Sequence, residues 1–326
     1  MKYIVTVCSV YFFSFLLNSS VYTGDTNLTP LGVNRDKLVE MAVVGEISPP
    51  VLGDPPYRIS PEGDIIATPA TGSITYNFRT GDSAVHMAGD HVEPAVSIVN
   101  FGNTNSRNSP ENVALNTLAC VGNNVTVISG DAKGAQGTVI GKHGGIENVI
   151  VEFPDEVYEN LAIGDRMQVR AIGLGMESVN IDDIYVMNLG PQLLDALNNN
   201  GMGITNEGRL RVPVTHHIPA KIMGSGLGQR HVYSGDYDIQ LFDKDVVDRY
   251  GLDTLRYGDI VAIIDADHRH GRIYRGGAVT IGVVVHGISA IAGHGPGVTT
   301  LITSPGGNIE PVIDHSSNLS DLLDLR

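Results

Sequence analysis

The stretch Asn124–Phe153, NVTVISGDAKGAQGTVIGKHGGIENVIVEF, decides the fold class of this chain. Its runs of valine, threonine and isoleucine predict three strands, and the Ser-Gly-Asp and Lys-Gly segments between them predict turns. We expect Gly134 and Gly137 to take the positive φ values that let a tight hairpin curl. The stretch therefore predicts a small, strongly curled β-structure.

This pattern is similar to the KOW element of small SH3-like barrels, which contacts RNA in ribosomal and transcription proteins. Here the only local cations are Lys133, Lys142 and His143, and acidic residues surround them. The whole chain has 21 basic and 36 acidic side chains, which gives a net charge of −15. Phosphate-binding surfaces need clustered positive charge, so we expect a structural barrel and no nucleic-acid partner.

Strand patterns continue on both sides of this element. Apolar and polar residues alternate over Arg166–Ile172 and Leu210–Val214, and continuous apolar runs occupy Ile260–Ile264 and Ala278–Val285. Capping residues and prolines predict only short helices, at Pro110–Cys120, Gln192–Asn198 and Lys244–Tyr250. The sequence predicts a mainly β protein, a β-rich α+β fold with two β domains, one of which includes the KOW-like small-barrel element.

The order of segments predicts the domain organisation. Residues 1–24 combine a lysine, an apolar run and a small-residue end, as secretory signal peptides do, and prolines favour an extended arm over residues 25–60. We expect an N-terminal β domain over 61–197, with the KOW-like element at 122–173, and a C-terminal β domain over 204–326. We therefore expect a secreted, extracellular or periplasmic protein with no membrane attachment after signal cleavage.

The segment Gly81–Pro94 is the leading candidate for a functional site. It carries His86, Asp90, His91 and Glu93 among glycines, and this density of nitrogen and oxygen donors suits zinc, manganese or iron. We predict that His86, Asp90 and His91 ligate the metal and that Glu93 moves a proton. The alternative is that the aspartates form turns and the histidines fill polar positions.

Two later segments could complete this site. Asp267 and His268 follow the apolar run that ends at Ile264, and polar loops at strand ends commonly carry catalytic groups. We expect Asp267 and His268 to serve as catalytic acid or base; the alternative, which the pattern slightly favours, is a solvated hairpin turn. His294 stands between two glycines, which leave room for a ligand, and we expect it to be a further metal ligand.

Four segments together resemble the domain of unknown function 4438, an uncharacterised prokaryotic family. They are Val39–Leu52, the AGDHVEPAVS stretch at 88–97, Gly141–Glu147 and Val285–Thr300. This resemblance covers nearly all of the chain after the leader and implies no known reaction.

A fainter similarity to acetamidases and formamidases implies amide hydrolysis in the Gly81–Pro94 loop. Those enzymes carry a Gly-Asp, a His, then Gly-Asp and Glu, which Gly81, Asp82, His86, Gly89, Asp90 and Glu93 match loosely.

Two functions from different classes therefore remain open. The first is a secreted metal-dependent hydrolase of amide-type, small-molecule substrates, in which a divalent metal polarises a carbonyl and lowers the pKa of its bound water to about 7. The second is a non-catalytic extracellular assembly or binding protein that forms homo-oligomers through strand edges and the proline-rich arm.

Overall fold

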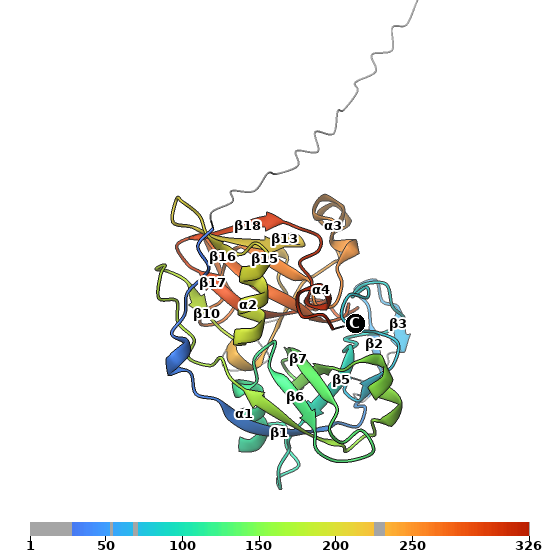
Figure 1. Ribbon diagram of the computed structural model, residues 1–326. Helices are drawn as coiled ribbons and strands as arrows, with labels where there is room; N and C mark the ends of the chain where they lie inside the picture. Colours follow the sequence, from blue (N-terminus) through green and yellow to red (C-terminus); the bar gives the residue numbers. More distant parts are fainter. Residues whose placement is uncertain (1–27, 53–54, 68–70, 225–231, 326) are drawn as a thin grey trace, which may run out of the picture.

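The computed structural model describes residues 28–52, 55–67, 71–224 and 232–325. The expected signal peptide, residues 1–24, lies outside these residues. Figure 1 shows that the chain forms two β-rich halves, with β1, β5, β6 and β7 in the lower half and β13 and β15 to β18 in the upper half. The predicted mainly β fold with two β domains is confirmed.

The N-terminal half is a closed, six-stranded antiparallel barrel. Its strands follow one another in the order β1-β9-β6-β7-β8-β5, and pairing of β1 with β5 closes the ring. A short strand, β4 (Ile74–Thr75), adds to β5 at the outside. The barrel strands are β1 (Met41–Ile47), β5 (Ala95–Val99), β6 (Asn124–Val127), β7 (Gln136–His143), β8 (Asn148–Glu152) and β9 (Arg166–Ala171). The predicted barrel element is thus four of these strands, and the proline-rich arm supplies β1.

The two hairpin glycines of the barrel behave differently from each other. Gly134 has φ of 99°, as predicted. The expectation for Gly137 is wrong, because its φ is not positive; a side chain there would lie 2.7 Å from the Phe153 ring and 2.6 Å from the Glu152 carbonyl oxygen. Gly137 is therefore needed for packing of β7 against β8, and Gly130, with φ of 73°, supplies a second left-handed position in the turn.

The C-terminal half contains a six-stranded sheet and a smaller three-stranded sheet. The large sheet runs β10-β17-β16-β15-β13, with β14 also paired to β17; the small sheet runs β11-β12-β18. A separate hairpin pairs β2 with β3. The bounds are β2 (Tyr57–Ile59), β3 (Ile65–Ala67), β10 (Tyr185–Val186), β11 (Gly203–Ile204), β12 (Leu210–Val214), β13 (His216–Pro219), β14 (Tyr237–Asp238), β15 (Ile260–Asp267), β16 (Ile273–His286), β17 (Gly297–Ser304) and β18 (Ile309–Ile313).

The helices are short, and the predicted start and stop residues define three of them. Ser109 caps α1 (Pro110–Leu118), Pro191 opens α2 (Pro191–Asn199), and Asp243 caps α3 (Lys244–Tyr250), which ends at the left-handed Gly251. The fourth is α4 (Leu319–Leu322). Single 3-10 turns occupy η1 (Arg35–Lys37), η2 (Asp155–Asn160), η3 (Ala220–Ile222), η4 (Val232–Ser234) and η5 (Leu252–Thr254). Among the described residues, no helix is long and apolar enough to span a membrane.

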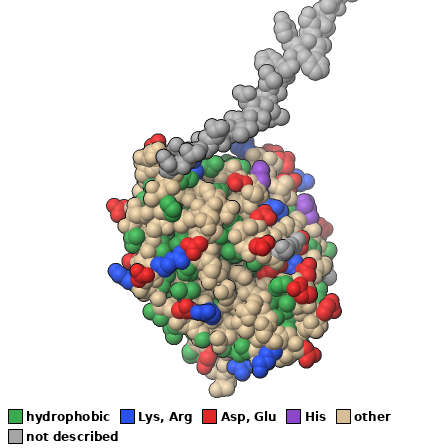
Figure 2. Space-filling view, viewed as in Figure 1, with side chains coloured by type: hydrophobic (Ala, Val, Ile, Leu, Met, Phe, Trp, Pro, Cys, Tyr) green, Lys and Arg blue, Asp and Glu red, His purple; other side chains and the backbone are tan. Residues whose placement is uncertain are grey.

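The acidic side chains, which outnumber the basic ones, do not form a single patch on the face shown in Figure 2. On the face shown in Figure 2, acidic side chains are spread over the molecule and basic side chains lie beside some of them. Such mixing keeps local fields weak over this face.

The two halves meet where β7 of the barrel crosses β16. Gly141 of β7 lies against Val285, and a Cβ atom at Gly141 would lie only 2.2 Å from Val285 Cγ1. One residue further on, the buried Lys142 donates its Nζ to Asn188 Oδ1 at 2.7 Å and to the Tyr233 carbonyl at 2.6 Å. The absence of a side chain at position 141 therefore sets how closely the barrel approaches the C-terminal sheet.

Replacing Gly141 tests this close crossing. We expect Gly141→Ala to destabilise the protein by about 1–3 kcal/mol, because the new methyl group overpacks the β7–β16 contact. Gly276→Ala is the matched control, since nothing lies within 4 Å of its Cβ position. Urea unfolding of both variants gives the comparison, and equal stabilities would contradict this account of the crossing.

Candidate functional site

Five chain segments converge beside the β7–β16 crossing. The loop between β4 and β5 brings His91, and β7 ends at His143. β16 ends at His286, the loop before β17 brings His294, and β14 brings Asp238. The rings of His143 and His286 stack with centroids 4.1 Å apart, and the His91 ring lies 5.1 Å from that of His286 and 5.0 Å from that of His294. Four imidazoles thus share one small region between the halves.

His91 is held by a buried carboxylate behind it. Its Nδ1 pairs with Asp90, whose carboxylate also accepts hydrogen bonds from Ser289 Oγ at 3.1 Å and from the Ala290 backbone nitrogen at 3.0 Å. Burial opposes ionisation of Asp90, but these bonds outweigh it and lower its pKa. The remaining ring nitrogen of His91, Nε2, lies 3.1 Å from His294 Nδ1. Asp90 therefore orients His91 toward the other histidines.

His143 is oriented by Glu93 in the same way. Its Nδ1 lies 2.6 Å from Glu93 Oε1, and the Glu93 carboxylate also accepts hydrogen bonds from Gly72, Ser97 and Asn148. Glu93 is only 1% exposed. Burial and the neighbouring His286 lower the pKa of His143, which favours the neutral ring with a lone pair on Nε2. A carboxylate–histidine pair of this kind is the usual support of a metal ligand.

His286 is fixed by a backbone carbonyl. Its Nδ1 donates to the Gly287 carbonyl oxygen at 3.0 Å, which leaves Nε2 facing two carboxylates, Asp236 Oδ2 at 2.8 Å and Asp238 Oδ1 at 3.7 Å. Burial opposes protonation of His286, but the two aspartates outweigh burial and raise its pKa well above the ordinary value. A cation is therefore strongly favoured at this position, either a proton on His286 or a metal ion.

Asp238 lies at the centre of the cluster. Its Oδ2 is 3.0 Å from His294 Nδ1 and 3.7 Å from His91 Nε2, and it accepts a hydrogen bond from the Gly295 backbone nitrogen at 3.2 Å. Burial opposes its ionisation, yet the surrounding imidazoles lower its pKa far below the usual range. Asp238 is thus a buried carboxylate ion beside three histidines, His91, His286 and His294.

These side chains form three overlapping groups that could hold a metal ion. In each group one ligand atom from every member lies within 4.8 Å of the others. The groups are His91 with His143 and His286, His91 with Asp238 and His294, and Asp236 with Asp238 and His286. Imidazole nitrogen and carboxylate oxygen suit zinc, manganese and iron.

The structure brings together only part of the site expected from the sequence. His91 and His294 are in the groups, and Asp90 and Glu93 stand directly behind His91 and His143. Among the described residues, none of the three groups includes His86, Asp267 or His268.

The three remaining residues have other surroundings. His86 is exposed on its loop. Asp267 pairs with Arg269 at 2.9 Å and with Arg275 at 3.5 Å, and the arginines lower its pKa. His268 packs on Tyr237, and burial lowers its pKa to about 3. Because neighbouring side chains on a strand point to opposite faces, His268 lies on the other side of β14 from Asp238.

Sequence reasoning missed His143, His286, Asp236 and Asp238 as site residues. His143 was considered only as a local cation of the barrel element. The Asp-Tyr-Asp spacing at 236–238 was the available clue, since residues two apart on a strand share a face. Only the folded structure shows that this face meets His286 and His294 within the C-terminal half and His91 from the barrel half.

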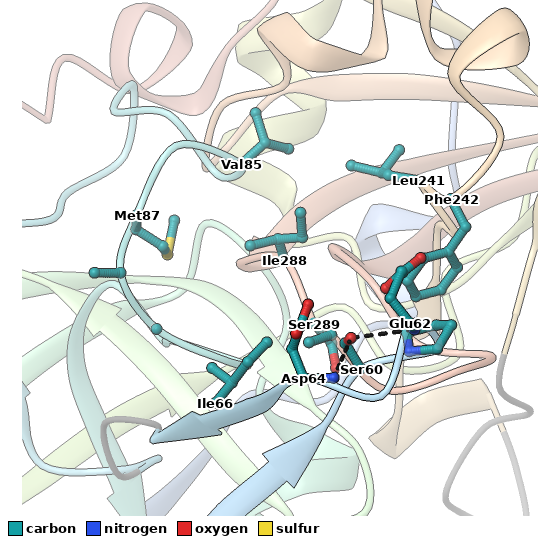
Figure 3. Close-up of a pocket in the computed structure, with 14 residues that line it drawn as sticks. Ser60, Glu62, Asp64, Ile66, Val85, Met87, Leu241, Phe242, Ile288 and Ser289 are labelled. Atoms are coloured by element: carbon teal, nitrogen blue, oxygen red, sulfur yellow. Dashed lines mark hydrogen bonds between the residues drawn. The ribbon is translucent and has the colours of Figure 1, made fainter.

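A pocket of about 470 Å³ adjoins the cluster. Figure 3 shows Ile66, Val85, Met87, Leu241, Phe242 and Ile288 around it, with Glu62 and Asp64 at one side. Ser289 and Ala290, which hydrogen-bond Asp90, are part of its wall. The apolar pocket and the histidine cluster are therefore separated by a single layer of residues.

Fold and site together define a two-domain β protein with a histidine and aspartate centre between a small barrel and a larger sheet. Models of the domain of unknown function DUF4438 match this chain, the N-terminal model over residues 57–195 and the C-terminal model over residues 201–323. The chain belongs to this family, as the sequence resemblance implied.

One solved structure is similar over nearly the whole chain. It is titled "Crystal structure of TM1086", shares 44% sequence identity, and superposes with a TM-score of 0.82 over 90% of this chain and 99% of that chain. The comparison with curated proteins finds no match.

The role of Glu93 behind His143 can be tested by one substitution. We expect Glu93→Gln to weaken zinc binding about 10- to 100-fold, as loss of a supporting carboxylate does. The exposed Glu159→Gln is the matched control. Competition with a chromophoric chelator measures both affinities, and an unchanged affinity in folded Glu93→Gln would contradict the orienting role.

Proposed function

We propose that this protein is a metal-dependent hydrolase and that its centre is formed by the histidines and aspartates between the two halves. One observation carries the proposal. A carboxylate or carbonyl oxygen holds one ring nitrogen in each of His91, His143 and His286, and the three rings lie close enough together to share a metal ion. That arrangement fixes the tautomers that metal binding requires.

The exposure of the donors supports catalysis over a purely structural metal. The His294 side chain is 35% exposed and that of His91 is 13% exposed, whereas His143 and His286 are buried. Structural sites are closed by protein ligands, and catalytic sites keep a position open. The cluster is buried on one side and reachable by water and substrate on the other.

For the reaction we propose hydrolysis of an amide, the class that the loose acetamidase-like pattern implies. A bound divalent ion would polarise the carbonyl and lower the pKa of a coordinated water to about 7. The net reaction adds water across the C–N bond: the oxygen joins the acyl carbon, and a proton goes to the leaving nitrogen. Within this proposal Asp90 and Glu93 orient imidazoles.

Loss of His91 tests both metal binding and activity. We expect full-length protein loaded with zinc, manganese or iron to release ammonia from acetamide or formamide, and His91→Ala to bind less metal and to lose activity. His86→Ala is the matched control, because His86 lies on the same loop outside all three groups, and it should keep both. Metal analysis with an ammonia assay gives the result. A wild-type protein that binds metal and cleaves neither amide would contradict the proposed substrate class, and one that binds no metal would contradict the function.

Self-association is a second candidate property, and the β2–β3 hairpin favours it. Ile59 is 57% exposed and Ile65 is 72% exposed on this two-stranded ribbon, and Val51 and Leu52 before it are also exposed. Adjacent exposed apolar side chains commonly mark a protein interface. We propose that this hairpin contacts a second copy of the chain.

A charge placed on the hairpin tests that contact. We expect the wild-type protein to be an oligomer in solution and Ile65→Glu to reduce its mass toward that of one chain, because the contact would bury the new carboxylate. Ile163→Glu changes another exposed isoleucine, 53% exposed, and should leave the oligomer intact. Light scattering after size exclusion measures the mass. A monomeric wild type would refute the contact.

A further inference from the structure

We propose that the centre holds two divalent metal ions and that the Asp238 carboxylate bridges them. This inference rests on the proposed function, since it assumes that the centre binds metal, and it adds the number of ions and their arrangement. The first indication of two ions is that the possible ligands form three overlapping groups and not one compact set.

The two oxygens of Asp238 face different sets of donors. Oδ2 is near His294 Nδ1 at 3.0 Å and His91 Nε2 at 3.7 Å, whereas Oδ1 is near His286 Nε2 at 3.7 Å. A carboxylate that serves one ion has no need of donors around both oxygens. The split defines two positions on opposite sides of one carboxylate.

The first position is formed by His91, His294 and Asp238. The distances between their ligand atoms are 3.1 Å, 3.0 Å and 3.7 Å. Such separations suit donors that lie about 2.0–2.2 Å from a common ion. This position contains the more exposed histidine and would keep the open coordination site.

The second position is formed by His286, Asp236 and Asp238. Asp236 Oδ2 is buried and lies 2.8 Å from His286 Nε2, with no further hydrogen-bond partner among the described residues. Its other oxygen, Oδ1, is held by the Gly144 backbone nitrogen at 2.7 Å. His143 stacks on His286 and forms a further group with His286 and His91 beside this position. A buried carboxylate oxygen this close to an imidazole nitrogen places two donors where one cation could bind both.

The charge of the region supports two ions. Asp90, Glu93, Asp236 and Asp238 are all at most 5% exposed. Within the described part of the chain, their ion pairs are all with histidines. Four buried carboxylates need compensating charge, and two divalent ions supply four positive charges. Two-metal hydrolytic centres hold their ions about 3.5–4 Å apart, a separation that a bridging carboxylate can span.

The test counts ions in the purified full-length chain after metal removal by a chelator. Titration with manganese(II), followed by the electron paramagnetic resonance signal of free manganese, should show two ions bound per wild-type chain and two in His86→Ala. His294→Ala and Asp236→Asn each remove a donor from one position and should bind one ion. Circular dichroism establishes that each variant is folded.

The bound signal supplies a second measurement that requires no variant. Two manganese ions joined by one carboxylate are magnetically coupled, so the loaded wild-type protein should give a coupled spectrum and His294→Ala an uncoupled one. One ion per wild-type chain, or two without coupling, would overturn the bridged pair and leave a metal-dependent hydrolase standing. No bound ion would remove the proposed function as well.

Discussion

The contact between Gly141 and Val285 is the constraint on which the rest of this structure depends. Because position 141 has no side chain, β7 crosses β16 closely enough for the last residues of both strands, His143 and His286, to stack. The barrel alone holds two of the four imidazoles, and the C-terminal sheet holds the others. The site therefore exists only where the two domains touch, as ligand sites between domains commonly do.

Hydrogen bonds to the outer ring nitrogens fix the orientation of the clustered histidines. Asp90, Glu93 and the Gly287 carbonyl each occupy one nitrogen of a different histidine, so the unoccupied nitrogens are directed inward before any ligand binds. These partners are themselves held by Ser289, Ser97 and Asn148. Burying so many polar groups is favourable only when each is satisfied. The pattern is typical of sites organised for chemistry in advance of binding.

Local signals in the sequence predicted the fold well. Ser109, Pro191 and Asp243 marked the helix starts, and the 166–172 alternation matched a barrel strand, because caps and period-two patterns act over a few residues. The prediction for Gly137 was wrong because glycine is needed there to make room for the Phe153 ring, and not to allow a positive φ. The site was predicted only in part for the same reason. His91 stood out by the local density of donors and His294 by its flanking glycines, whereas His143 and Asp238 become site residues only through contacts between segments about 48 positions or more apart.

Electrostatics connects these observations to function. The raised pKa of His286 and the lowered pKa of Asp238 have one cause, the close pairing of buried imidazoles with buried carboxylates. Protons on histidines can balance the carboxylate charge, and the proposed divalent ions would balance it while also engaging Asp236 Oδ2 beside His286. A purely structural role would not explain why a chain with few charged residues, 17% of the total, buries four carboxylates at the boundary of its domains.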